Sequence, residues 1–277
     1  MSSIRAVLMH ADAATPWAER LGFATAVAKL LDAELTTIYA GESCWTQDPF
    51  VMVSSPEAAA ILREMEQQRL RQARSDHDSA RAAIGSLGSW EEAGSQTPER
   101  AVSTRAMTAD LLVLGQRDRR SPRPGTVSSR FIGSVVIDSG RPALVVPYIG
   151  ASPKIDVVLI AWKETREAAR ALTAAIPFLQ QARGVHVATW MDAGSDGGDG
   201  AVDVLGYLRR HGIDALHQDC GAPPGDVGEA MLSLAADLSA DLLVMGCYGH
   251  SRAREHILGG ATRSILEAMT IPVLMAH

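Results

Sequence analysis

Short apolar runs alternate along the chain with longer segments in which apolar residues recur every three or four positions. The short runs predict β-strands, and the longer segments predict α-helices. The predicted strands cover residues 4–9, 34–40, 110–114, 143–146, 155–162, 185–190, 214–218, 241–245 and 272–276. The predicted helices cover residues 15–31, 57–84, 165–180, 199–211, 224–238 and 261–269, with one more beginning near residue 97 and another ending at residue 139. Strands that alternate with helices predict an α/β protein with parallel, doubly wound sheets.

Two strand patterns occur twice. The segment ADLLVLG at residues 109–115 matches ADLLVMG at 240–246, and RPALVV at 141–146 matches IPVLMA at 271–276. The similar spacing of the two matches predicts duplication of a whole unit. Gly, Ser and Pro interrupt the apolar pattern between residues 149 and 154. We therefore expect two tandem Rossmann-like domains, residues 1–149 and 150–277.

Composition excludes several classes of protein. The 277 residues are 47% hydrophobic and 21% charged, with a net charge of −6 and a pI near 5.8, so the chain does not resemble a nucleic-acid-binding protein. Its three cysteines form no C-x-x-C pair, and we expect neither a disulfide framework nor a structural metal. Without a signal-peptide pattern or an apolar run of membrane-spanning length, the chain is expected to be cytoplasmic and away from membranes.

The segment after the strand at 241–245 is the best candidate for a binding site. Gly246 and Gly249 follow the strand, and Gly259 and Gly260 precede the helix at 261–269. A helix start of this kind offers free backbone N–H groups to an anion, and glycine would let a phosphate approach the backbone. Nearby donors or positive charges come from His250, Arg252, Arg254 and Arg263. The spacing is neither a Walker A nor a G-x-G-x-x-G motif, so an ordinary glycine-rich turn is the alternative.

This segment resembles the nucleotide loop of the universal stress protein family, G-2x-G-9x-G-[ST]. Gly246 and Gly249 are followed after nine residues by Gly259, within GCYGHSR, LGGATRSIL and IPVLM. The resemblance implies an adenine nucleotide alpha hydrolase-like fold and binding of ATP or AMP. Gly260 stands where ATP-binding members of the family have Ser or Thr, so a hydroxyl donor is missing.

Ligands of doubly wound sheets bind beyond the carboxyl ends of the strands, where the strand order reverses. In the second half, residues 161–165, the strand end near Thr189 and residues 246–262 should converge there. Lys163 occupies the position at which the resembling family commonly has an acidic residue. The residues expected to contact a nucleotide are Ala161, Trp162, Lys163, Thr165, Met245, Gly246, Gly249, His250, Arg252, Gly259, Gly260, Ala261 and Thr262.

The first half departs further from the family pattern. Asp118 stands in place of the second glycine, where a carboxylate would repel phosphate, and no acidic strand-end residue is evident around His10. We predict that this half binds no nucleotide and is mainly structural. A weaker hypothesis is that its arginine-rich loop at 117–123 takes a different anion.

The sequence supports no enzymatic activity. It lacks the H-E-x-x-H and G-x-S-x-G motifs. Cys247 is expected to be a small semi-buried residue, although its position before a helix could lower the pKa of its thiol. Two hypotheses stay open: a nucleotide-sensing protein, or a nucleotide-free interaction protein or scaffold of the same fold. A slow ATP hydrolase ranks behind both.

The resemblance also implies antiparallel pairing of strands 143–146 and 273–276 in an internal pseudo-dimer. Association into a homodimer is left open.

Overall fold

The computed structural model describes residues 4–13, 17–42, 55–84, 88–94, 96–118, 126–190, 202–222, 225–249 and 260–277. The chain divides into two compact units. The first comprises residues 1–141 and 148–150, and the second comprises residues 142–147 and 151–277. The strand at 143–146 thus belongs to the second unit, although it lies in the first half of the sequence. The expected division at residues 149 and 150 stays a prediction.

The first unit is built on parallel strands. These are β1 (Ala6–Ala11), β2 (Glu34–Tyr39), β3 (Trp90–Glu92) and β4 (Leu111–Gly115). Their order is β3-β2-β1-β4, with β1 paired to both β2 and β4. Residues along β1 and β4 are buried on both faces, as expected of a parallel sheet covered on both sides. The strand order reverses between β1 and β4.

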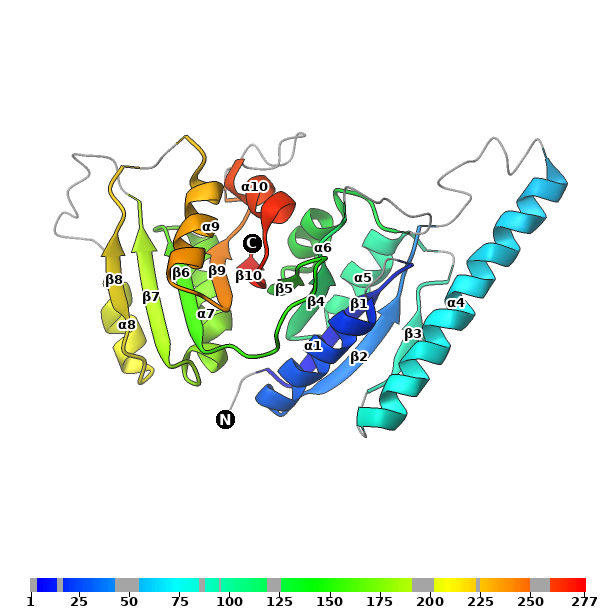
Figure 1. Cartoon of the computed structure of the whole chain (residues 1–277), viewed down its shortest axis with the longest axis horizontal. Helices are drawn as coiled ribbons and strands as arrows, with labels where there is room; N and C mark the ends of the chain where they lie inside the picture. The colour runs from blue at the N-terminus through cyan, green and yellow to red at the C-terminus, as the bar shows by residue number, and fades with distance from the viewer. Residues whose placement is uncertain are drawn as a thin grey trace. The chain divides into compact units, whose positions relative to one another are not determined.

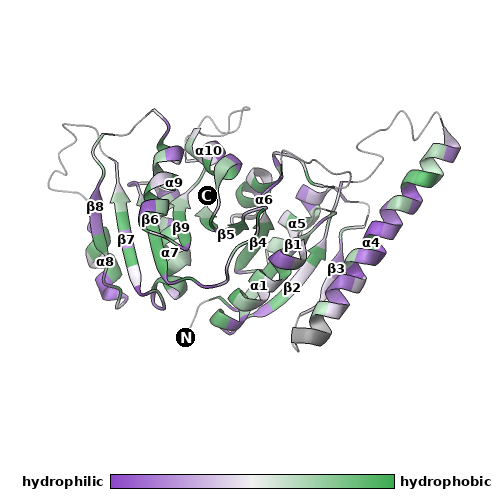
Figure 2. Cartoon of the chain, in the orientation of Figure 1, coloured by the Kyte–Doolittle hydropathy of each residue, from purple (hydrophilic) through white to green (hydrophobic). Residues whose placement is uncertain are grey.

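Helices cover both faces of this sheet (Figure 1). They are α1 (Trp17–Leu31), α4 (Pro56–Ile84), α5 (Pro98–Ala106) and α6 (Phe131–Ser139). The long α4 is mainly hydrophilic, whereas the central strands are mainly hydrophobic (Figure 2). One contact between α4 and the sheet edge is made by the buried ring of His77, whose centroid lies 5.0 Å from that of Trp90 on β3.

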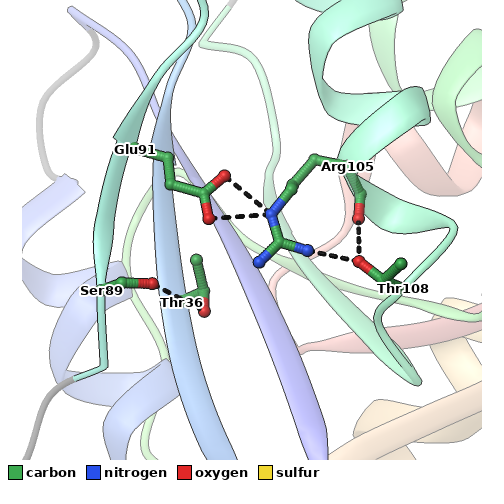
Figure 3. A network of polar contacts seen from close by, with 5 residues as sticks. All are labelled: Thr36, Ser89, Glu91, Arg105 and Thr108. Carbon is green, nitrogen blue, oxygen red and sulfur yellow. Dashed lines mark hydrogen bonds and ion pairs between the residues drawn. The ribbon is translucent and has the colours of Figure 1, made fainter.

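The sequence pattern missed β3, because three residues are too few to show alternation. Its place at the edge is held by polar contacts (Figure 3). Arg105 of α5 donates through Nε to both carboxylate oxygens of Glu91, at 2.9 and 2.7 Å, and its Nη1 donates to the Thr108 hydroxyl. The hydrogen bond to Glu91 raises the pKa of Arg105 above its ordinary value. Glu91 is therefore a half-buried structural partner of Arg105 rather than a freely solvated charge.

The second unit contains parallel strands and one antiparallel pair. The parallel strands are β6 (Val157–Trp162), β7 (Gly184–Thr189), β8 (Leu216–Asp219), β9 (Leu242–Gly246) and β10 (Val273–Ala276). Their order is β10-β9-β6-β7-β8, and β5 (Ala143–Val146) pairs antiparallel with β10. The predicted antiparallel pairing of 143–146 with 273–276 is thus confirmed.

Helices also flank both faces of the second sheet (Figure 1). They are α7 (Arg166–Leu179), α8 (Val204–Arg210), α9 (Val227–Asp237) and α10 (Gly260–Ala268). Helix α8 is shorter than the predicted 199–211, because the Asp203 side chain caps it and accepts from the Gly206 amide at 2.6 Å. The α/β class with mostly parallel, doubly wound sheets is confirmed.

Candidate functional site

In the second unit the strand order reverses between β6 and β9. The chain passes from β6 outward through β7 to β8, and β9 then pairs with the other side of β6. Register pairs Ala161 of β6 with Met245 of β9, so both strands end at the same sheet edge. Ligands of this fold class bind at such an edge. The side chains of Ala161, Trp162 and Met245 are themselves buried, with 9% exposure or less.

Helix α7 begins directly beyond the end of β6. Thr165 is its N-cap, with an extended backbone and a hydroxyl that accepts from the Ala168 amide at 3.2 Å. Lys163 is exposed, and its carbonyl accepts from the Thr165 amide at 2.7 Å. The sequence therefore places a helix N-terminus, with its partial positive charge, at the predicted edge. At the end of β7, which is also predicted to contribute to the site, the Thr189 side chain is buried and its hydroxyl forms a hydrogen bond with His217 Nε2 at 3.0 Å.

Gly246 is required by packing between β9 and α7. A Cβ at this position would lie 2.5 Å from the Ala168 nitrogen and 2.8 Å from the Glu167 carbonyl carbon. Both are backbone atoms, which cannot swing aside as a side chain would. The space that a missing side chain leaves at Gly246 is thus filled by α7, and a ligand phosphate cannot use it.

Gly249 faces a buried carboxylate. A Cβ here would lie 3.0 Å from Oε2 of Glu167, the second residue of α7, whose exposure is 2%. The other carboxylate oxygen accepts from Arg166 Nε at 2.6 Å. Burial alone would raise the pKa of Glu167, but the Arg166 hydrogen bond, its own backbone amide and electrostatic contributions from Arg166 and His277 together lower it. A negative charge therefore lies against the loop in which the sequence predicts an anion site.

Sequence reasoning missed Glu167. An acidic residue in the first turn of a helix is common and is ordinarily solvated, since it complements the helix dipole from the surface. Nothing in the local pattern shows that this carboxylate turns inward toward residues more than 80 positions away. Only the packing of α7 against the end of β9 reveals it.

The turn after β9 is tightly held. Cys247 is buried, its amide donates to the Ala276 carbonyl at 2.9 Å, and its own carbonyl lies 3.2 Å from Nδ1 of His277. Burial, with the nearby charge of Glu167, raises the pKa of the Cys247 thiol. The sequence position allowed a lowered pKa for Cys247, and this is wrong because the thiol is buried and lies near the negative charge of Glu167. Tyr248 is also buried and takes the left-handed backbone conformation, with φ of 59°.

Helix α10 begins at Gly260. Among the residues that the structure describes, no atom lies within 4 Å of the position that a Cβ of Gly260 would occupy. The following turn is anchored to α9, because Asp226 caps α9 through Oδ1 and accepts through Oδ2 from the Ser264 hydroxyl at 2.6 Å. Ala261 is half-buried and Thr262 is buried. His250, Arg252 and Gly259, which the sequence also predicts to contact a nucleotide, lie outside the described residues.

The first unit is different at the corresponding edge between β1 and β4. Asp12 follows β1 as Lys163 follows β6, and it is buried in an ion pair with Arg20, with 3.1 Å between Oδ1 and Nη2. The Arg20 guanidinium lies over Gly115, where an added Cβ would be 1.5 Å from Nη1. The expectation of no acidic residue near the end of β1 is therefore wrong. Asp12 was not recognised as the residue at the strand end, because the predicted strand stops at residue 9. In the structure β1 extends to Ala11, and Asp12 follows it directly.

The described residues show neither a metal-binding group nor a membrane-spanning helix. No three His, Cys, Asp or Glu side chains among them are grouped so as to hold a metal ion. No described helix is both long and apolar enough to cross a bilayer.

Comparison with known proteins gives one family. The model of the universal stress protein family matches residues 223–277. The Universal stress protein Slr1230 of Synechocystis sp. is 42% identical over 50 residues, which are 18% of this chain and 17% of that protein. The matched segment therefore spans less than a fifth of that relative.

Solved structures match over nearly the whole chain. A universal stress protein from Archaeoglobus fulgidus DSM 4304 superposes with a TM-score of 0.70 and 16% identity, covering 98% of this chain and 96% of that one. A functionally unknown protein from Pseudomonas aeruginosa PAO1 has a TM-score of 0.59 and 14% identity, covering 98% and 92%. These matches show the shared fold. The C-terminal segment at residues 223–277 is in addition similar in sequence to the universal stress protein family.

Proposed function

We propose that this chain is a non-catalytic stress-response protein that binds an adenine nucleotide, ATP or AMP, in its second unit. The observation that carries the proposal is the start of α10 at Gly260, which no described residue covers, on the chain segment that leaves β9 where the strand order reverses. The N-terminus of α7 lies at the end of β6, next to β9. Helix N-termini at this position of a doubly wound sheet favour a phosphate.

The absence of catalysis is part of the proposal. Phosphoryl transfer needs Mg²⁺ and carboxylates to hold it. The residue that follows β6 is the exposed Lys163, and the carboxylate nearest to Gly249 belongs to Glu167, which is already paired with Arg166. Cys247 is buried, with a raised thiol pKa, so it does not supply a nucleophile.

A nucleotide-free scaffold is the second candidate, and one observation favours it. The buried Glu167 carboxylate lies against Gly249, where an incoming phosphate would meet a like charge. Under this alternative the fold and the turn after β9 persist only because they pack well. The glycines would then serve the packing of α7 rather than a ligand.

Calorimetric titration with ATP and AMP tests the proposal on the whole purified chain, after mass spectrometry of any copurified nucleotide. Gly260→Glu is the informative variant, because its side chain meets no described atom and adds bulk and negative charge at the α10 start. The control is Gly22→Glu, an exposed helical position in the first unit with nothing within 4 Å of the added Cβ. We expect binding to native chain and control, and none to Gly260→Glu. Binding to neither nucleotide by the native chain would support the scaffold, and equal binding by Gly260→Glu would refute the assigned position.

The assembly and location of the chain are further proposals. We propose that the β5–β10 pairing joins the two duplicated halves as an internal pseudo-dimer and that the protein is cytoplasmic. Pairing of both strands covers backbone edges that would otherwise be exposed. Light scattering on the purified chain distinguishes a monomer from a homodimer, and cell fractionation tests the location.

A further inference from the structure

The proposed function assigns no role in nucleotide binding to the charged side chain of Glu167. It is 2% exposed, although acidic residues in the first turn of a helix are ordinarily solvated. Glu229 shows the usual arrangement, because it stands in the first turn of α9 and is exposed. Burial of Glu167 is therefore a particular feature of α7.

The carboxylate of Glu167 is directed at the turn after β9. Oε2 is the closest atom to the position where Gly249 would carry a Cβ, at 3.0 Å. The same charge contributes to the raised pKa of the neighbouring Cys247 thiol. Two residues of this turn thus experience the charge of Glu167 directly.

Among the described residues, Arg166 is the side chain that forms an ion pair with Glu167. Arg166 donates to Oε1, but its own side chain is 73% exposed, so the neutralising cation lies on the solvent side. The pKa of Glu167 is lowered despite burial, which keeps the carboxylate ionised at neutral pH. A ligand that approaches Gly249 therefore meets a fixed negative charge.

We propose that Glu167 is a specificity-determining residue that limits the negative charge accepted beside Gly249, so that without divalent cations the second unit prefers AMP to ATP. This inference rests on the proposed function. ATP carries about two more negative charges than AMP near neutral pH. Repulsion between like charges a few ångströms apart, at effective dielectric constants between those of protein and water, weakens binding about tenfold.

The experiment compares ATP and AMP affinities by calorimetry in EDTA, for the native chain, Glu167→Gln and the control Glu229→Gln. Glutamine has nearly the size of glutamate and keeps an oxygen that accepts from Arg166, so the variant removes mainly the charge. We expect about tenfold tighter ATP binding by Glu167→Gln, a smaller change for AMP, and native behaviour for Glu229→Gln. Thermal unfolding of each variant verifies that the second unit is folded.

The outcomes separate this inference from the function on which it rests. Equal ATP affinity in the native chain and Glu167→Gln overturns the role of Glu167 but leaves nucleotide binding intact. If Glu167→Gln binds ATP and the native chain binds no nucleotide, the role of Glu167 is supported but the proposed function of the native protein is refuted. If neither the native chain nor any variant binds a nucleotide, both proposals are refuted. If Glu167→Gln does not fold, the native chain still decides, because ATP binding as tight as AMP binding in EDTA contradicts the proposal.

Discussion

Gly246→Ala is the sharpest test of how the second unit is packed. The added methyl carbon would lie 2.5 Å from the Ala168 nitrogen, which is 0.9 Å closer than ordinary contact allows. The three nearest atoms all belong to the backbone of α7, so the helix start must move away from the strand. Overpacking of this kind costs about 1 to 3 kcal/mol, and we expect a value near the upper end because no side chain can rotate away.

The assay measures unfolding of the whole chain by heat and by urea, and calorimetry and circular dichroism detect the transition. For a protein of this size, a loss of about 3 kcal/mol lowers the Tm by roughly 6 °C or more. Gly260→Ala is the matched control, since its methyl group meets no described atom within 4 Å, and we expect a change within about 0.5 kcal/mol in the free energy of unfolding. If Gly246→Ala unfolds at the same temperature as the native chain, the close approach of α7 to β9 is not a feature of the protein in solution.

Three further predictions concern the first unit and the helix start. Asp12→Ala leaves the buried Arg20 unpaired and should cost about 3 kcal/mol or more in urea unfolding, with a smaller loss when Arg20 is also replaced by Met. Burial lowers the pKa of His10 to about 4. The unfolded chain binds a proton at this imidazole near pH 6.5, whereas the folded chain does not. The free energy of unfolding should therefore fall as the pH drops from 6.5 to about 4. His10→Gln should flatten this dependence when unfolding is measured at a series of pH values. Gly260→Ser adds a hydroxyl at the start of α10 and should tighten ATP binding about fivefold by calorimetry; unchanged affinity would exclude this helix start from the site.

Much of the fold follows from the apolar pattern. The runs LLVLG and LLVMG are buried strands, and the glycine that ends each stands at a sheet edge. These runs are recognisable because a strand covered on both faces must be apolar at every position. The three-residue β3 carries no such signal, because hydrogen bonds and the ion pair between Glu91 and Arg105 hold it at the edge.

The candidate site could be located from the sequence but not interpreted from it. The alternation of strands and helices predicts parallel, doubly wound sheets with ligands at the carboxyl ends of the strands. The structure supplies the strand order that places the ends of β6 and β9 side by side. The roles of individual glycines do not follow, since Gly246 is filled by backbone, Gly249 faces Glu167 and Gly260 is covered by no described residue. The spacing of the glycines in the sequence does not distinguish these three roles.

The sequence by itself thus determined the α/β class, the positions of the long elements and the segment after β9 as the place to look for a ligand. Only the tertiary structure decided that Glu167 lies buried against this segment and that Asp12 pairs with Arg20 in the first unit. The physical reason is that periodicity reports which residues avoid water along one element. The charge and space beside a given backbone atom depend on whichever distant element packs there.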